Sequence, residues 1–364
     1  MKVVIIGGGL MGWFAAMVAT SCGHETTLIE TNKVSPLSVG ESLSFNMAYQ
    51  CKKYLGMDLT VELNQGMKMF NRFTGWAEYD MVHSKEEIAR IEGRQIHNAD
   101  DEFSHIQAEF SKDVIKKYVK PKLCCYDTRK VLPNETFDAD IVLDCTGLNR
   151  LLMKEQEFVE YDLPCTMATA GRVTPIVNDP WTTTRAMEAG WQWTVTLPTL
   201  TGSGYVFSPD FISPEEAREA MRVYWEAQGK TWECMVKQIK WTPGRYESSY
   251  HNNVFALGLA AGFTEPMEAG AIAGGMIAVK ELLDYGSDFQ TAHIHQSEIL
   301  DELAYNTGLH YKLCNRQEPF WQSLNRTIDQ DVLDWHLNNQ TEYGFFPMGS
   351  YRLLLESHRR GLND

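Results

Sequence analysis

Apolar residues and glycines alternate sharply at the start of the chain. Residues 2–6 (KVVII) form a β-branched run that is typical of a strand buried on both faces of a parallel sheet. Glycines follow it, and an alanine-rich stretch to about residue 23 predicts a helix. Residues 24–30 (HETTLIE) predict a second strand that ends in a carboxylate. This order predicts that the chain opens with a βαβ unit.

The later pattern predicts blocks of strands and helices without an internal repeat. Proline and two acids after Ser213 suit a helix start. Gly202 and Gly204 indicate a turn or a close approach of two backbones. The predicted segments are helices at 102–119, at 214–228, near 272–285 and through most of 287–364, and strands at 139–147, within 165–208 and at 253–259.

Composition and charge exclude some classes of partner. The apolar fraction of 44% in 364 residues can fill a large core. The 48 acidic and 33 basic side chains give a net charge of -15, which repels phosphate backbones and anionic lipids. No run of about eighteen apolar residues occurs, and the N-terminus lacks the pattern of a cleavable signal. We therefore expect a cytoplasmic protein with neither nucleic acid nor membrane as a partner.

The cysteines and histidines do not indicate a metal site. The eight cysteines form no CxxC pair and no zinc spacing, so we expect free, buried thiols. His293 and His295 are the nearest approach to a ligand pair, and no neighbouring residue completes a site. No metal is predicted.

The first glycine cluster has the GxGxxG spacing, with glycines at Gly7, Gly9 and Gly12. Such glycines allow a tight turn, a close approach to a pyrophosphate and close packing of helix on sheet. Glu30 follows eighteen residues after the third glycine, where a carboxylate can accept a hydrogen bond from a ribose hydroxyl. Because a strand and a second glycine-rich segment at 258–275 appear more than two hundred residues later, we predict FAD rather than NAD as the ligand.

Six motifs, in order along most of the chain, resemble those of the flavin-dependent halogenases of the tryptophan halogenase type. The motifs are GGGLMGW at 7–13, VGES at 39–42, DCTGL at 144–148, GSGYVFS at 202–208, GLAAGFTEPMEAG at 258–270 and PFW at 319–321. The resemblance implies an α/β, glutathione-reductase-like FAD-binding fold with an interleaved β-sheet and a helical substrate region. It implies an FAD-binding module formed by 1–75, 110–150 and 245–285, and a substrate-facing region formed by 76–109, 151–244 and 286–364.

The resemblance also assigns FAD contacts to individual positions. These are Gly7, Gly9, Leu10, Met11, Gly12, Glu30, Val39, Gly40, Glu41, Thr146, Gly147, Gly258, Gly262, Ala271 and Ile272.

The stretch GWQWTVTLP at 190–198 resembles the GWxWxIP signature of these enzymes. In the family its tryptophans separate flavin from substrate, so the resemblance assigns Trp191 and Trp193 to a channel wall, together with Phe263 and Pro266. From the residues alone, a strand whose indoles only fill the core explains the pattern as well. Because the proline follows Trp193 by five residues rather than three, we expect the end of this strand to bulge or shift.

Residues 68–76 (KMFNRFTGW) resemble the family's strand with the catalytic lysine, which falls on Lys68, and Arg72 falls on a second basic position. Alternation places Lys68, Phe70, Arg72 and Thr74 on one face, and a solvated edge strand is the alternative explanation. The resemblance implies that the Lys68 amine polarises hypohalous acid or is transiently halogenated.

Glu268 resembles the family's active-site glutamate, which helps to position the halogenating species and accepts a proton from the ring. A helix cap is the alternative role for this carboxylate. The family has Ser-Thr-Gly after the glutamate, whereas this chain has Ala269, Gly270 and Ala271. Backbone amides of Gly270 and Ala271 could still bind halide, without the serine hydroxyl.

The chain is shorter than typical tryptophan halogenases between Trp76 and residue 102 and after Trp321, in regions that build the family's substrate pocket. The resemblance therefore implies an FAD-dependent halogenase that uses FADH2, O2 and chloride, bromide or iodide on a small indole- or phenol-type aromatic substrate. A separate NAD(P)H-dependent flavin reductase would supply the reduced flavin, and a homodimer stays open. An FAD-dependent aromatic monooxygenase and a flavin-binding protein without turnover are the alternatives.

Overall fold

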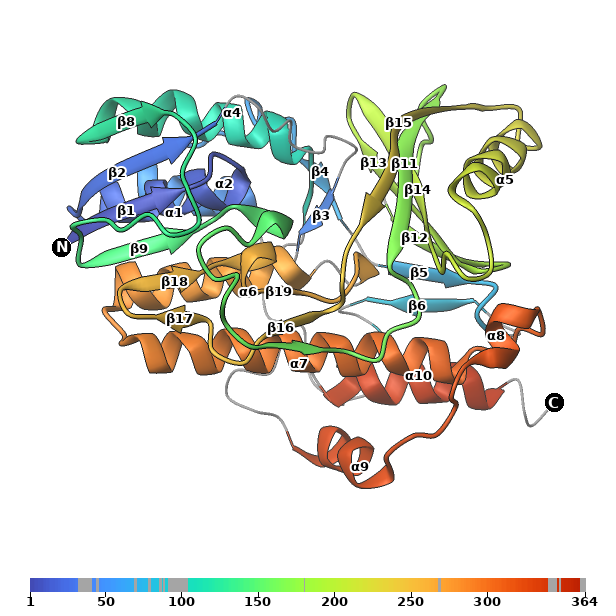
Figure 1. Ribbon diagram of the computed structural model, residues 1–364. Coiled ribbons are helices and arrows are strands. Elements are labelled where there is room, and N and C mark those ends of the chain that lie inside the picture. Colours follow the sequence, from blue (N-terminus) through green and yellow to red (C-terminus); the bar gives the residue numbers. More distant parts are fainter. Residues whose placement is uncertain are drawn as a thin grey trace.

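The computed structural model shows two large sheets side by side, with a long helix running beneath both of them (Figure 1). The structure describes residues 1–31, 41–43, 46–68, 71–77, 80–84, 87, 89–90, 104–179, 181–267, 270–339, 346 and 348–360, with the backbone alone at 41, 42, 67, 271, 349 and 358–360.

The first sheet has six strands and confirms the predicted βαβ start. Its order is β17 (Tyr250–His251), β18 (Val254–Ala256), β9 (Ile141–Asp144), β1 (Lys2–Ile6), β2 (Glu25–Glu30) and β8 (Cys125–Thr128). All neighbours pair in parallel except β17 with β18. Because the chain goes from β1 to β2 on one side and later adds β9 on the other, the end of β1 is a topological switch point, where open α/β sheets bind ligands.

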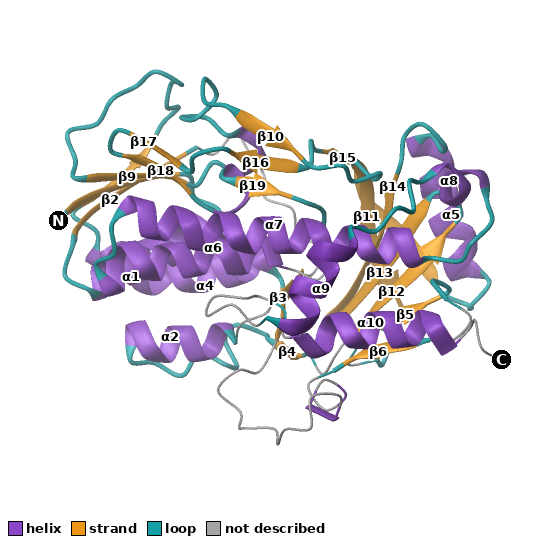
Figure 2. Ribbon diagram, turned by 90° about the horizontal axis from the view of Figure 1, so that it is seen from below, coloured by secondary structure: helices purple, strands orange, loops and turns teal. Residues whose placement is uncertain are grey.

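Helices from distant parts of the chain cover one face of this sheet (Figure 2). They are α1 (Leu10–Ser21), α4 (Ala108–Val119) and α6 (Gly270–Lys280), which continues as a π-helical turn over Glu281–Tyr285; α2 (Met47–Leu55) packs on α1, farther from the sheet (Figure 2). Residues 10 and 12–19 of α1 are buried, because α4, α6 and the sheet all pack against this helix. Such burial explains why α1 is apolar on all sides rather than amphipathic.

One predicted helix is wrong in its first turn. Residues 104–106 form strand β7 (Ser104–Ile106), and α4 begins only at Ala108. Strand β7 pairs with β3 (Glu41–Leu43) on one side and with β4 (Gly66–Met67) on the other. Long-range pairing thus overrides the helical spacing of apolar residues that continued into α4.

The second large sheet has seven strands and confirms the predicted antiparallel region. Its order is β15 (Thr231–Lys240), β11 (Met167–Thr174), β14 (Leu200–Phe207), β13 (Gly190–Leu197), β12 (Thr182–Met187), β5 (Asn71–Thr74) and β6 (Met81–His83). Helix α5 (Pro214–Glu226) packs on one face and starts with a capping box, in which Ser213 and Glu216 each bond the other's backbone.

The opposite face of this sheet packs against the C-terminal helices. These are α7 (Phe289–Leu313), α8 (Pro319–Ser323) and α10 (Met348–Arg360), as the predicted helical tail requires; α9 (Gln330–Asn338) packs on α10, farther from the sheet (Figure 1). A large apolar cluster fills the interface, and it includes Trp191, Trp193, Trp241, Leu303 and Trp321. A small sheet of β10 (Phe158–Glu160), β16 (Gly244–Tyr246) and β19 (Gly262–Phe263) lies between the two large sheets (Figure 1).

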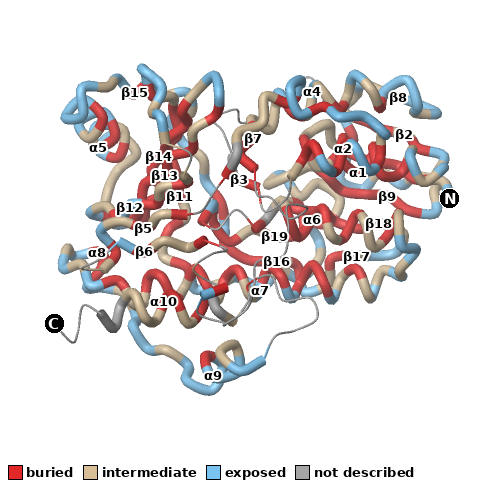
Figure 3. Tube along the Cα trace, turned by 180° about the vertical axis from the view of Figure 1, so that it is seen from behind, coloured by how far each residue is buried: buried red, intermediate tan, exposed pale blue. Residues whose placement is uncertain are grey.

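Burial follows these layers: the inner strands and the helix faces that meet them are buried, and the outer sides of α5 and α9 are exposed (Figure 3). All eight cysteines are free thiols, as expected, but the expected burial is wrong for Cys124 and Cys125, which are exposed at the edge strand β8. Among the helices that the structure describes, none combines the length and the apolar character that crossing a bilayer demands.

Candidate active site

The glycines of the first loop have different surroundings. A Cβ on Gly7 would lie 2.4 Å from the carbonyl oxygen of Cys145, and one on Gly12 would lie 1.9 Å from that of Gly7. A Cβ on Gly9 would meet no atom within 4 Å. Gly7 and Gly12 are therefore needed for packing of the chain on itself, whereas Gly9 leaves open space outside the loop.

Gly9 is also the N-cap of α1, and no side chain caps the N-terminus of this helix. The first N–H groups of α1 thus lack helical partners and point toward the space beside Gly9. A helix N-terminus with free N–H groups attracts phosphate. The loop fits the pyrophosphate of a dinucleotide.

Glu30, the predicted ribose ligand, lies at the end of β2 against Gly8, whose added Cβ would overlap the carboxylate. Lys116 Nζ donates to Glu30 Oε1 over 2.5 Å, and the Tyr126 hydroxyl donates to the same oxygen. Burial raises the pKa of Glu30, but these two hydrogen bonds outweigh it and hold the pKa below its ordinary value. The ionised carboxylate is an acceptor suited to ribose hydroxyls.

Other predicted FAD positions line the same end of the sheet. Gly147 has φ of 64° and open space where a side chain would lie, directly after Thr146, whose hydroxyl donates to Asp144. Gly258 has φ of 56°, and its backbone N–H donates to Oε1 of Gln296 on α7. A Cβ on Gly275 would touch both Met11 and Gly258, so the two glycine-rich segments meet as α1 and α6 pack.

The other predicted FAD positions are packed against neighbouring elements or have no described side chain. Gly262 is packed against β16, Ile272 is half-buried in α6, and Leu10 is buried in α1. Only the backbone is described at Glu41 and Ala271, and Val39 and Gly40 lie outside the described residues. Their roles in FAD binding stay predictions.

Trp191 and Trp193 both lie on the face of β13 that packs against α7, with ring centroids 6.3 Å apart. The expected bulge at the end of this strand is wrong: β13 pairs with β14 in one register from Gly190 to Leu197. Leu197 pairs with Leu200, so the two residues between them, starting with the late proline, form the hairpin turn. β13 therefore continues regularly for two residues more than the family signature implies.

Lys68 follows β4 and is only 7% exposed. The predicted single strand over 68–76 is wrong, because β4 belongs to the three-stranded sheet and β5 to the seven-stranded one. Lys68 thus lies where the chain passes from one sheet to the other. Arg72, on β5, stacks its guanidinium over Trp181 at 3.2 Å from the ring centroid. A solvated edge position for Lys68 is excluded by its burial.

The charge of Lys68 acts on His105 of β7. Its Nδ1 donates to the carbonyl oxygen of Thr196 over 3.0 Å, and its Nε2 accepts from the hydroxyl of Thr182 over 2.8 Å. Burial and then the charge of Lys68 lower the pKa of His105 to about 3, although the bond to Thr196 opposes this. His105 is therefore neutral and has both nitrogens engaged, so it cannot take the proton of the lysine.

The strand register places Thr182, the partner of His105, on the tryptophan face. Thr184 of β12 lies opposite Trp193 and Ala186 lies opposite Trp191, so Thr182 points to the same side, one row beyond Trp193. His105 binds the Thr182 hydroxyl, and the charge of Lys68 acts on His105. Rows on one face of a strand are about 7 Å apart, so the order along the face is Thr182, Trp193, Trp191 over roughly 13 Å, with His105 at the Thr182 end.

Glu265 stands at the far end of this row and was missed from the sequence. It lies between β19 and α6, is 2% exposed, and accepts from Trp191 Nε1 and from the Tyr311 hydroxyl, each over 2.9 Å. Burial raises the pKa of Glu265 to about 8, although the bonds from Tyr311 and Trp191 oppose the rise. A carboxylate in an otherwise apolar run, GFTEPM, was the signal for it.

The predicted proton acceptor Glu268 lies outside the described residues, as does Ala269. Gly270 is buried at the start of α6, where an added Cβ would lie 2.3 Å from Leu303 of α7. Leu303 therefore fills the space that a side chain at position 270 would need. Of the two other channel predictions, Phe263 is half-buried against Trp241 and Pro266 is exposed.

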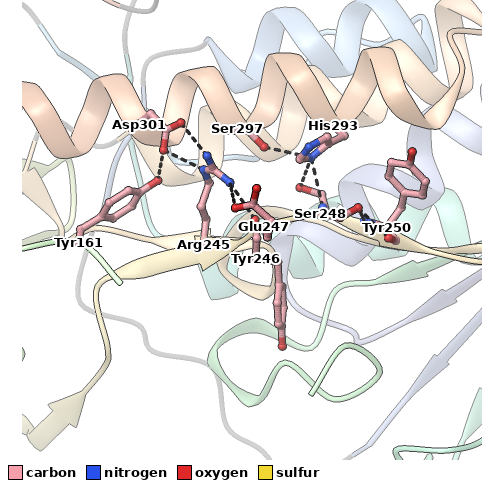
Figure 4. A network of polar contacts seen from close by, with 10 residues as sticks. Tyr161, Arg245, Tyr246, Glu247, Ser248, Tyr250, His293, Ser297 and Asp301 are labelled. Carbon is pink, nitrogen blue, oxygen red and sulfur yellow. Dashed lines mark hydrogen bonds and ion pairs between the residues drawn. The ribbon is translucent and has the colours of Figure 1, made fainter. Parts of the chain in front are cut away.

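The two histidines noted in the sequence belong to structural contacts. His293 Nδ1 accepts from the backbone N–H of Ser249 and contacts the hydroxyl of Ser297, and nearby Arg245 forms a bidentate pair with Asp301 (Figure 4). These contacts tie α7 to the segment between β16 and β17. His295 lies 3.3 Å from Glu281. Within the described part of the chain, no three His, Cys, Asp or Glu side chains are grouped to hold a metal.

Comparison with known proteins decides the family. A model of the tryptophan halogenase family matches residues 2–121 and 124–350. The chain belongs to the tryptophan halogenase family. This is a family of flavin-dependent enzymes, and its members use reduced FAD, oxygen and halide, typically with a flavin reductase as partner and an aromatic substrate.

Individual halogenases are distant relatives. Tryptophan 6-halogenase SttH of Streptomyces toxytricini is 25% identical over 78% of this chain and 71% of its own. Tryptophan 7-halogenase RebH of Lentzea aerocolonigenes is 21% identical over 88% of this chain and 78% of its own. This halogenase-family chain is thus shorter than the relatives it matches.

Solved halogenase structures confirm the predicted glutathione-reductase-like FAD fold. The SttH structure aligns with a TM-score of 0.83 at 21% identity, covering 97% of this chain and 89% of SttH. BrvH, a flavin-dependent halogenase from Brevundimonas sp. BAL3, aligns with a TM-score of 0.79 at 20% identity, covering 98% and 89%. The division of this halogenase-family fold into two modules stays a prediction.

Proposed function

We propose that the protein is an FAD-dependent halogenase that delivers hypohalous acid along the tryptophan face to Lys68, where an electron-rich indole or phenol ring is halogenated. The observation that supports this proposal is the burial of Lys68, whose charge acts on His105, together with the bond from His105 to Thr182, one row beyond Trp193 on the tryptophan face. FAD, held in reduced form at the Gly7–Gly12 loop and Glu30, would supply hypohalous acid from oxygen and a halide ion.

The tryptophan face suits transfer of a small oxidant. Trp191 is 1% and Trp193 9% exposed, and they occupy the two rows between Thr182, which binds His105, and the Glu265 carboxyl that binds Trp191. Apolar walls exclude bulk water, which limits loss of the oxidant. Bulky indoles also keep an aromatic substrate away from the flavin side, so only a small molecule passes.

Lys68 then acts at the end of this face. Its ammonium would donate to the oxygen of hypohalous acid and so polarise the O–X bond, or its neutral amine would carry the halogen as a chloramine-type group. On the first route the aromatic ring takes the halogen, the hydroxide takes the lysine proton and leaves as water, and the ring proton passes to a carboxylate. On the second route water leaves when the amine takes the halogen; the ring then takes the halogen from the nitrogen, and the ring proton returns to that nitrogen through the carboxylate. Neutral His105, with both ring nitrogens engaged, does not compete for the lysine proton. We assign the ring proton to Glu268, three residues beyond Glu265.

Halide binding is proposed at the start of α6. Gly270 and Ala271 are the first residues of an eleven-residue helix, whose first N–H groups lack helical partners. The substrate pocket is expected to be more open than in the longer relatives, so we propose varied indoles and phenols rather than free tryptophan. Since the sequence has one GxGxxG loop, a separate NAD(P)H-dependent reductase would supply the reduced flavin.

The test is a panel of indoles and phenols with a flavin reductase, NADH, FAD and chloride, bromide or iodide, read by mass spectrometry. Lys68→Ala should lower halogenated product by about 100-fold or more while reduced flavin is still consumed. Lys280→Ala, which removes a half-buried lysine at the far end of α6, is the matched control and should keep the product.

Three outcomes would contradict the proposal. A Lys68→Ala variant that halogenates normally removes the role of that lysine. Hydroxylated products without halogen would indicate an aromatic monooxygenase. Reduced flavin that reacts with oxygen at its uncatalysed rate under every condition would indicate a flavin-binding protein without turnover.

A further inference from the structure

We propose that Glu265 is a positioning residue that ties the loop before α6 to the indole of Trp191, and that it does so as a protonated carboxylic acid. The effect on halogenation rests on the function proposed above. The tie itself does not, because it is a property of the folded chain.

Three separate elements meet at this carboxyl group. Glu265 lies in the loop after β19, Trp191 in β13 and Tyr311 near the end of α7. Each of the two carboxyl oxygens has one partner at 2.9 Å, and the group is 2% exposed. Within the described part of the chain, no lysine or arginine forms an ion pair with this carboxyl. A buried carboxyl without a cation is far more stable in its neutral form.

The hydrogen positions follow from the chemistry of the partners. The indole N–H can only donate, so Glu265 Oε1 is an acceptor. Oε2 lies 2.9 Å from the Tyr311 hydroxyl, which donates to it when the carboxylate is ionised; in the neutral acid this bond reverses, and the proton on Oε2 is donated to the Tyr311 oxygen. In the neutral acid, Oε1 accepts from the indole and Oε2 donates to the Tyr311 oxygen, so both carboxyl oxygens have a partner.

The titratable groups that face Glu265 do not compete for its proton. Among the described residues they are Tyr311 on α7 and Cys165 just before β11. Burial raises the pKa of both groups well above their ordinary values, so both stay neutral. Only Glu265, with its pKa at about 8, changes charge near neutral pH.

The same loop has a second attachment. Trp241 Nε1 donates to the carbonyl oxygen of Thr264 over 2.9 Å, next to Glu265 in sequence. The two contacts fix the start of the segment that leads, within five residues, to Glu268 and the N-terminus of α6. Loss of the Glu265 contacts would free both the wall indole and the approach to the proposed halide turn.

The direct test is infrared difference spectroscopy of the full-length protein, wild type minus Glu265→Gln, in H2O and D2O from pH 6 to 10. We expect a carboxylic acid C=O band at pH 6 that shifts in D2O and disappears as the pH rises past about 8. A difference spectrum without this band at pH 6 would overturn the protonated tie, whether or not the protein halogenates.

The functional test compares two substitutions at one position. Glu265→Gln keeps an acceptor for Trp191 and a donor for Tyr311, so halogenated product per FADH2 consumed should stay within about twofold and no longer fall at high pH. Glu265→Leu leaves the Trp191 N–H without its acceptor and the Tyr311 oxygen without its donor, and it should lower that ratio about tenfold, with the remainder appearing as hydrogen peroxide. Equal losses in both variants, or none in Glu265→Leu, would overturn the positioning role.

If Glu265→Leu fails to fold, Trp191→Phe removes only the indole donor and should lower the same ratio. The matched control is Trp232→Phe, which removes an indole bond to Ser203 on the opposite, α5-covered face of the same sheet. It should leave product per FADH2 unchanged, and equal losses in the two variants would contradict the tie. A wild type that halogenates nothing refutes the proposed function, and the infrared band still decides the tie.

Discussion

The contrast between Gly9 and Gly12 gives the sharpest test of cofactor binding. Gly9 has φ of −73° and ψ of −178°, which alanine adopts freely, and its added methyl would meet no protein atom within 4 Å. The methyl on Gly12 would lie 1.9 Å from the Gly7 oxygen. Gly9→Ala should therefore disturb only a bound ligand, whereas Gly12→Ala should disturb the fold.

The expected sizes follow from these distances. Gly9→Ala has two opposing effects on stability. Alanine lowers the entropy of the unfolded chain, which stabilises the fold, but it is a poorer N-cap than glycine, so the free energy of unfolding should change by less than about 0.5 kcal/mol. The methyl would intrude on a pyrophosphate and weaken FAD binding by about 10- to 100-fold, or about 1.4–2.7 kcal/mol. Gly12→Ala needs a backbone shift of roughly 1.5 Å to restore an ordinary contact and should cost about 2–4 kcal/mol of stability.

The assay pairs thermal unfolding of the FAD-free proteins with titration of oxidised FAD by flavin fluorescence. Gly9→Ala should melt like wild type and bind FAD weakly, and Gly12→Ala should melt several degrees lower. Wild-type FAD affinity in Gly9→Ala would show that the pyrophosphate does not lie beside Gly9. A fully stable Gly12→Ala would refute the reasoning about chain packing.

Three further predictions concern stability and the wall. Because the pKa of His105 is lowered in the fold, its neutral form stabilises the protein fully above pH 6.5, and this stabilisation is lost as the pH falls toward about 3. The free energy of unfolding in urea should therefore drop by about 2 kcal/mol between pH 7 and pH 5. The drop should be smaller in His105→Gln. Gly204→Ala places a methyl 2.0 Å from the Trp193 ring, so it should change tryptophan fluorescence and lower halogenated product per FADH2, and unchanged spectra would contradict this. Ser213→Ala removes the capping box with Glu216 and should cost about 1 kcal/mol in urea unfolding without changing FAD affinity.

Local patterns predicted the elements whose signals are short-range. The βαβ start, the capped helix after Ser213 and the strands within 165–208 follow from alternation, glycines and caps, and the structure confirms them. The helix over 102–119 and the strand over 68–76 were wrong for one reason. Residues 104–106 form β7 of the small sheet, and β4 of the same sheet ends at Met67, immediately before Lys68; the partners in this sheet are far apart in sequence and give no periodic signal.

The candidate site divides in the same way. Gly9 and Glu30 were predicted because a loop and the strand after it carry their chemistry together. His105, Glu265 and Tyr311 were missed, since each gains its meaning from a partner on another element that spacing does not reveal. The bulge expected in β13 was wrong because two extra residues lengthened a hairpin instead of distorting it.

The long helix α7 has a consequence for how this protein can vary in length. Gln296 binds the backbone of Ala256 and Gly258 at the flavin sheet, and Tyr311, on the same helix, binds Glu265 at the wall. The two residues lie about 22 Å apart along a rigid rod that spaces the two halves of the enzyme. One inserted residue between them would rotate Tyr311 by about 100° away from its partner. We therefore expect insertions and deletions to be tolerated before and after this rod but not inside it.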